Sequence, residues 1–187
     1  MQLQAKRAPS EPAPDLRINL VQGDYHVTGD ANAVLATLLG SCVAACMRDP
    51  EAGVGGLNHS LLPSGEGFGE RDMQRYGVHA MELLVNGLLR LGARRERLEA
   101  HLFGGARMSE RLADIGSTNA DFAVDFLRRE GIAHVGGSLR GERARRIQFW
   151  PTTGRLRQFL VSQRVDPVQD FARKVPAFET AGQVDLF

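Results

Sequence analysis

The chain has 187 residues, 43% of them hydrophobic, which fits one domain with a sizeable core better than two domains. Its 23 basic and 22 acidic residues nearly cancel, which argues against a nucleic-acid binder, because such proteins usually show a clear basic excess. We find neither the apolar core of a signal peptide nor a stretch long enough to span a bilayer, so we expect a cytoplasmic protein without membrane insertion.

Composition divides the chain into three parts. Residues 1–15 contain Pro9, Pro12 and Pro14 among Ser, Glu and Ala, which predicts a disordered leader. Residues 16–165 carry the periodic patterns of a single domain. Residues 166–187 show little periodicity and are expected to form a C-terminal extension.

Apolar runs predict the extended elements of this domain. Residues 17–21 and 25–28 are expected to form two strands around Gly23-Asp24. Apolar runs follow at 34–39, 43–47 and 54–62. Further strands are predicted at 98–103, 132–135, 146–150 and 156–161, with a hairpin turn at 151–154 before the last of them.

Two helices are predicted between these runs. Apolar residues repeat at helical spacing over 81–91, and Gly92 suits the end of that helix. The second helix is expected over 119–130, where Thr118 with Asp121 resembles a capping box. Residues 63–73 are rich in Gly, Glu and Ser and predict a surface loop. The sum is an α+β (mixed α/β) domain of layered mixed β-sheets with flanking helices.

Charge is concentrated in one stretch. Residues 128–157 carry eight arginines against Glu130 and Glu142. We interpret this stretch as a solvated edge strand, and the alternative is a contact surface for an acidic protein partner.

The segment around Cys42 carries the chemistry. It reads Thr37-Leu-Leu-Gly-Ser-Cys42-Val-Ala-Ala-Cys46 and is followed by Gly55-Gly-Leu-Asn-His59. A nucleophilic cysteine needs a lowered pKa, typically about 3.5–7.5, and His59 is the candidate to lower it and to act as its base. A third group must orient the imidazole, and Thr37 and Asn58 are the nearby polar candidates.

The backbone before the thiol can contribute as well. Gly40 permits a tight approach to Cys42, and backbone amides near Ser41 and Cys42 can face an oxyanion. Gly55-Gly56 is expected to give the chain freedom to bring His59 against Cys42.

Structural interpretations compete with this chemistry. Free cysteines are often small buried apolar residues, and Cys46 is expected to be packed rather than reactive. His59 alone is equally compatible with a structural, hydrogen-bonded histidine. We expect no metal site, because Cys42 and Cys46 lack a second ligand pair at regular spacing. No cofactor motif is found.

Several motifs, taken in order along the chain, resemble those of the CheD family of chemoreceptor glutamine deamidases. The resemblance rests on the Thr-Leu-Leu-Gly-Ser-Cys-Val run, on Gly-Gly-Leu-Asn-His with Leu62-Pro63, and on Leu-Phe-Gly-Gly-Ala-Arg-Met at 102–108. It continues through Ile115-Gly116, Asn119, Gly136-Gly137, Arg143, Arg145 and Thr153-Gly154. Together these motifs cover about residues 17–161.

This resemblance implies a cysteine amidohydrolase with Cys42 as nucleophile, His59 as base and Thr37 as third member. It implies a fold similar to the toxin-deamidase-like cysteine hydrolases. The implied substrates are glutamines on the cytoplasmic helical bundle of methyl-accepting chemotaxis receptors, and glutamate methyl esters for some members. A CheC-type phosphatase is an implied partner.

Two other functions stay open at this stage. One is a different cysteine amidase or esterase. The other is a non-catalytic chemotaxis regulator that binds a CheC-type phosphatase or a receptor.

Overall fold

The computed structural model describes residues 16–62, 69–108 and 115–161. The predicted leader and C-terminal extension lie outside the described residues, as does the first part of the loop predicted at 63–73. In the described part of the chain, neither helix is both long and apolar enough to cross a membrane.

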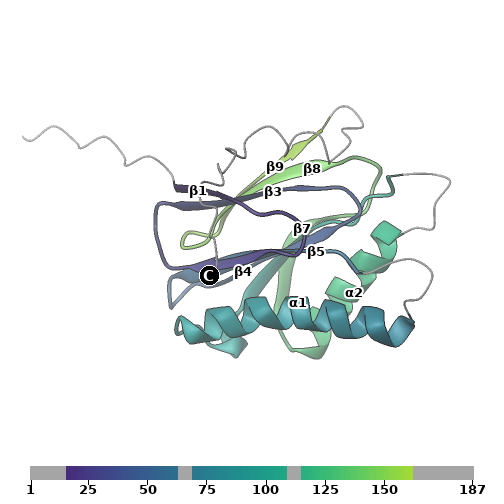
Figure 1. Ribbon diagram of the computed structural model, residues 1–187. Coiled ribbons are helices and arrows are strands. Elements are labelled where there is room, and N and C mark those ends of the chain that lie inside the picture. The colour runs from purple at the N-terminus through teal and green to yellow at the C-terminus, as the bar shows by residue number, and fades with distance from the viewer. Residues whose placement is uncertain (1–15, 63–68, 109–114, 162–187) are drawn as a thin grey trace, which may run out of the picture.

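Two mixed sheets and two helices form three layers (Figure 1). The four-stranded sheet has the order β1 (Leu16–Asn19), β3 (Ala33–Leu39), β8 (Arg145–Trp150), β9 (Arg155–Leu160). The five-stranded sheet has the order β2 (Tyr25–Thr28), β5 (Val54–Ser60), β4 (Val43–Asp49), β6 (Glu99–Gly104), β7 (Ala133–Leu139). Helices α1 (Glu70–Arg90) and α2 (Ile115–Arg129) cover the outer face of the five-stranded sheet, and a short 3-10 turn spans Arg95–Arg97.

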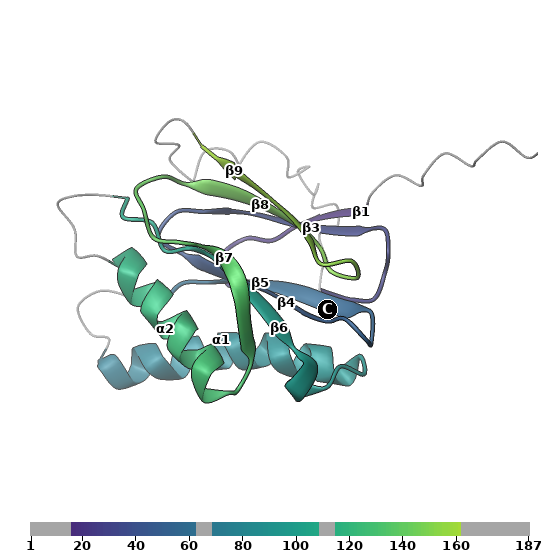
Figure 2. The same ribbon diagram turned by 180° about the vertical axis from the view of Figure 1, so that it is seen from behind.

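This arrangement confirms the predicted α+β class. The pairs β1–β3 and β6–β7 are parallel, and the other pairs are antiparallel, so both sheets are mixed. The view from behind shows α2 and α1 on the same side of β4–β7 (Figure 2). The apolar runs at 43–47 and 54–62 therefore belong to β4 and β5, strands of the sheet that lies between the other two layers.

Strand β4 divides the core in two. Ala44 and Cys46 face the four-stranded sheet and pack with residues of β3 and β8. Val43, Ala45 and Met47 face the helices. The helices contribute fully buried side chains, each worth about 1.5–3 kcal/mol of burial, and these include Met81, Leu84, Leu88 and Leu127.

Both helices begin earlier than the apolar pattern predicts. Helix α1 begins at Glu70, within the predicted loop. The apolar pattern misses its first turns because they expose polar side chains such as Arg71, Gln74 and Arg75. Helix α2 begins at Ile115, so Thr118 lies inside it and the predicted capping box is wrong. Apolar periodicity reports only the turns that pack against the sheet.

The glycine pair in β5 does not act as predicted. Gly55 and Gly56 lie within the strand and have ordinary backbone angles. A Cβ on Gly56 would meet His26 O at 2.5 Å and Leu84 Cδ1 at 2.9 Å. The glycines therefore allow close packing, and the expectation that they give His59 freedom to move is wrong.

The arginine-rich stretch is only partly a solvated edge. Strand β9 is the edge of its sheet, as predicted, and the Arg155 guanidinium lies 3.6 Å from the centre of the Trp150 ring. Arg145 is buried instead, and donates to Ser138 Oγ at 3.0 Å and to the backbone oxygens of Ser138 and Arg140. The stretch therefore does not form one continuous surface.

Asp49, at the end of β4, is a buried carboxylate. It accepts hydrogen bonds from Arg94 N at 2.9 Å, from the Arg97 guanidinium at 2.7 and 2.9 Å, and from the backbone amides of Glu51 and Ala52. Burial raises its pKa, but these donors outweigh it and lower the pKa from 3.8 to about 2. The carboxylate ties the β4–β5 turn to the segment after α1.

We expect Asp49→Asn to lower the free energy of unfolding at neutral pH, since an amide NH₂ group would face several N–H donors. Because the folded-state pKa is depressed, the wild-type contribution is present above pH 3.8 and is lost as pH falls toward 2. Urea unfolding across that range should show a smaller acid dependence in the variant. Glu51→Gln is the control, since Glu51 is 72% exposed in its ion pair with Arg97. An equal loss in both variants would contradict this assignment.

Candidate active site

A hydrogen bond between Thr37 and His59 joins the two sheets. Thr37 lies on β3 and His59 on β5, and the distance from Thr37 Oγ1 to His59 Nδ1 is 2.8 Å. The same hydroxyl donates to Leu20 O at 2.9 Å. A hydroxyl has one proton, so Oγ1 must accept from Nδ1–H. The proton therefore sits on Nδ1, and Nε2 keeps its lone pair.

The backbone of His59 is fastened to the turn between β1 and β2. Gly23 N donates to His59 O at 2.8 Å, and His59 N donates to Asp24 O at 2.9 Å. Leu20 N donates to Ala36 O at 2.8 Å on the other sheet. Residues 20–24 thus connect the strand of Thr37 to the strand of His59.

His59 Nε2 is buried and has no hydrogen-bond partner among the described residues. The side chain is only 6% exposed. Burial lowers the pKa of His59 below 6.5, against the opposing influence of the Leu20 carbonyl and the Asp24 carboxylate. The imidazole is therefore neutral at pH 7 and can accept a proton at Nε2.

Cys42 lies in the bend just before β4. The register pairs Ala44 with His59, two residues beyond Cys42, and the Cys42 side chain packs against the same core between the sheets. The thiol is partly buried, and Sγ donates to Gln22 Oε1 at 3.8 Å. In the described part of the chain, Cys42 and His59 are not hydrogen-bonded to each other.

The pKa of Cys42 contradicts the sequence expectation. Burial raises it from 9.0 to about 11, although the backbone N–H of Cys42 opposes the shift. The prediction that the resting thiol has a lowered pKa is therefore wrong. Desolvation of the thiol and of the imidazole favours the neutral form of each group.

The backbone near Cys42 is held by the segment after β6. Gly105 N donates to Cys42 O at 2.7 Å, and Ala106 N donates to Gly40 O at 2.9 Å. Gly104 has φ +108°, and a Cβ there would lie 2.0 Å from Cys42 O. Only glycine permits this approach to the carbonyl of Cys42.

Asn119 on α2 connects the Cys42 and His59 segments. Its Nδ2 donates to Ser41 O at 3.2 Å and to Ile115 O at 2.8 Å, and its Oδ1 accepts from Leu62 N at 2.7 Å. The side chain is 3% exposed. One buried carboxamide therefore fixes the residue before Cys42 and the chain that leaves β5. The sequence marked Asn119 only through the family resemblance.

The remaining predicted residues have different positions. Gly40 and Ser41 precede the thiol as expected, and a Cβ on Gly40 would meet the Met108 side chain at 3.2 Å. Asn58 is turned away from His59 toward α1, where its carboxamide contacts Ala45 N, Ala80 O and Met81 Sδ. Asn58 thus links β4, β5 and α1.

Cys46 is packed, as expected. It is 1% exposed within the core between the sheets, and burial raises its pKa. Among residues 16–62, 69–108 and 115–161, no three His, Cys, Asp or Glu side chains gather as a metal site would require.

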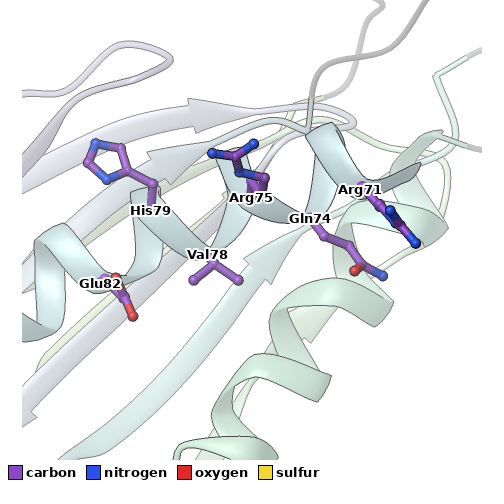
Figure 3. A pocket seen from close by; sticks show the side chains of 6 residues that line it. All are labelled: Arg71, Gln74, Arg75, Val78, His79 and Glu82. Carbon is purple, nitrogen blue, oxygen red and sulfur yellow. The ribbon is translucent and has the colours of Figure 1, made fainter. Parts of the chain in front are cut away.

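Two hollows lie beside α1. One, of about 200 Å³, reaches His59, and its lining includes Asp24, Tyr25, Asn58, His59, Tyr76 and His79. The other lies along the exposed face of α1, and Figure 3 shows the six residues that line it: Arg71, Gln74, Arg75, Val78, His79 and Glu82. His79 lines both hollows, which therefore adjoin each other on α1.

A partly exposed thiol, a buried imidazole and a threonine that orients this imidazole are the candidate catalytic groups of the α+β domain. The chain belongs to the CheD family: the family profile "CheD chemotactic sensory transduction" matches residues 61–158.

Close relatives span nearly the whole chain. A "Probable chemoreceptor glutamine deamidase CheD" from Caulobacter vibrioides is 52% identical over 95% of this chain and 96% of its own length. A protein of the same name from Acidiphilium cryptum is 53% identical over 96% and 98%. Among solved structures, the Bacillus licheniformis hypothetical protein YfiH covers 69% of this chain and 61% of its own at 12% identity, with a TM-score of 0.41.

We expect Thr37→Val to lower the free energy of unfolding by about 1–3 kcal/mol, because it leaves Leu20 O and His59 Nδ1–H without their partner. Thr37→Ser keeps the hydroxyl and is the matched control. Nitrogen NMR of His59 should show the proton on Nδ1 in the wild type and in Thr37→Ser. A wild-type imidazole protonated on Nε2 would contradict the assignment.

The lowered pKa of His59 predicts a pH effect on stability. The unfolded chain binds a proton near pH 6.5, whereas the folded chain binds it only at lower pH. The free energy of unfolding should therefore decrease as pH falls below 6.5, through the window between the two pKa values. His59→Gln should lack this part of the acid dependence. Identical pH profiles would show that His59 titrates normally.

Proposed function

We propose that this protein hydrolyses specific glutamine side chains on methyl-accepting chemotaxis receptors to glutamate, with Cys42 as nucleophile and His59 as base. The observation that carries the proposal is the free Nε2 of His59, buried, oriented by Thr37 and on the strand beside Cys42. The two named relatives support the substrate class, because both are described as probable chemoreceptor glutamine deamidases.

The first half-reaction forms a thioester. His59 Nε2 takes the thiol proton, and the sulfur of Cys42 attacks the carboxamide carbon of the substrate. The carbonyl oxygen becomes an oxyanion, and backbone N–H groups near Ser41 and Cys42 are the proposed donors to it. His59 returns the proton to the departing nitrogen, the C–N bond breaks, and ammonia leaves.

The second half-reaction restores the enzyme. His59 takes a proton from water as the water attacks the thioester carbon. The C–S bond breaks, the sulfur of Cys42 recovers its proton, and glutamate is released. Apart from the substrate, the groups that form bonds or transfer protons in these steps are a thiol, an imidazole and water.

The resting pair is neutral in this mechanism. Burial raises the pKa of the Cys42 thiol to about 11 and lowers the pKa of the His59 imidazole. Desolvation therefore opposes a preformed thiolate–imidazolium pair. We infer that the proton moves to His59 as the sulfur attacks, when the substrate can share the developing charge.

Location and partners follow from the same proposal. Receptor helical bundles that are modified in this way lie in the cytoplasm, so we place the protein there. A CheC-type phosphatase is a proposed partner that would adjust the reaction. Each new glutamate adds a negative charge to a receptor helix and shifts its signalling equilibrium by local electrostatics.

We expect Cys42→Ala to abolish deamidation of a receptor cytoplasmic fragment, as read by peptide mass. Cys46→Ala is the matched control, because this thiol is sealed in the core and takes no part in the chemistry. Far-ultraviolet circular dichroism should show both variants folded. Full activity of Cys42→Ala, or loss of activity only in Cys46→Ala, would disprove the nucleophile assignment.

A further inference from the structure

The thiol of Cys42 faces a glutamine of the protein itself. Gln22 Oε1 lies 3.8 Å from Cys42 Sγ and accepts its S–H. Gln22 is exposed, so its carboxamide lies where the thiol meets solvent. A carboxamide is also the group that the proposed reaction consumes. Cys42 thus rests against the chemical equivalent of its substrate.

The backbone of His59 is hydrogen-bonded to the turn that contains Gln22. Gln22 lies in a turn closed by Asp24 N donating to Val21 O at 3.0 Å and by Val21 N donating to Asp24 Oδ2 at 3.1 Å. Both backbone groups of His59 bond to this turn, on Gly23 and Asp24. The backbone of Gln22 is therefore held close to the backbone of His59, although the two residues are distant in sequence.

We propose that Gln22 is a specificity-determining residue whose carboxamide hydrogen-bonds the reacting carboxamide of the substrate. The inference rests on the proposed function for the identity of the reaction. It adds the means by which the site distinguishes an amide from the acid that it produces.

Proton transfer releases the acceptor for this role. In the resting state, Gln22 Oε1 is occupied by the thiol proton. When that proton moves to His59, Oε1 loses its donor and can accept an N–H from the substrate carboxamide. A side chain without N–H cannot donate to this oxygen, and a carboxylate is repelled by it. The site therefore discriminates between an amide and an acid by about the value of one hydrogen bond.

Alkylation of Cys42 tests this recognition without using deamidation. Iodoacetamide carries a carboxamide beside its reactive carbon, whereas iodoacetate carries a carboxylate. The ratio of their alkylation rates at Cys42, followed by peptide mass, reports how the site treats the two groups. A general change in thiol reactivity alters both rates equally and leaves the ratio unchanged.

We expect Gln22→Met to lower the iodoacetamide-to-iodoacetate ratio by about threefold to tenfold, the value of one hydrogen bond. Methionine has a similar length and no amide. Gln158→Met is the matched control, since Gln158 is exposed on β9 and should leave the ratio unchanged. A ratio within twofold of wild type in Gln22→Met, or an equal fall in the control, would overturn the proposal.

The deamidation assay distinguishes a failure of the proposed function from a failure of the role assigned to Gln22. Gln22→Met should lower kcat/KM on a receptor fragment by a similar factor, while Gln158→Met should not. If the wild type deamidates no receptor fragment, the proposed function fails, and the alkylation ratio still decides the role of Gln22. If deamidation occurs and Gln22→Met leaves both readouts unchanged, the inference alone fails.

Discussion

The hydrogen bond between Thr37 and His59 is the interaction on which the site depends. It crosses from one sheet to the other and uses the single proton of the hydroxyl to leave Nε2 bare. The position of the imidazole and its tautomer therefore follow from the packing of two sheets. Sheets that did not meet at this distance would leave a buried histidine with no defined function.

Desolvation shapes the chemistry as strongly as geometry does. The same burial that keeps His59 neutral raises the pKa of the Cys42 thiol. A thiol in this state reacts slowly with oxidants and stray electrophiles, because the thiolate is the reactive form. A carboxamide is a poor electrophile, so the site depends on placing it correctly. Asn119 and Gly104 serve that purpose by fixing the backbone on either side of the thiol.

The class of fold follows from sequence, and the sequence also singles out Cys42, His59 and Thr37 as candidate catalytic residues. Apolar runs located most strands, and the α+β class is confirmed. The pattern did not show the first turns of α1, because polar exposed residues carry no periodic signal. It could not show that residues 20–24 join the strands of Thr37 and His59, so Gln22 was missed. The pKa of Cys42 depends on burial, which distances along the chain do not reveal.

The arginines of β9 have a consequence for the molecule in crowded solution. Among the described residues, β9 is an edge strand, and a sheet edge offers backbone groups with which the edge of another molecule can pair. Phe159 and Leu160 on this edge are about half exposed and would favour such stacking. Arg155 and Arg157 place cations along the same edge, so two identical edges repel each other. Replacing these two arginines with uncharged residues would remove the repulsion and favour aggregation through this edge.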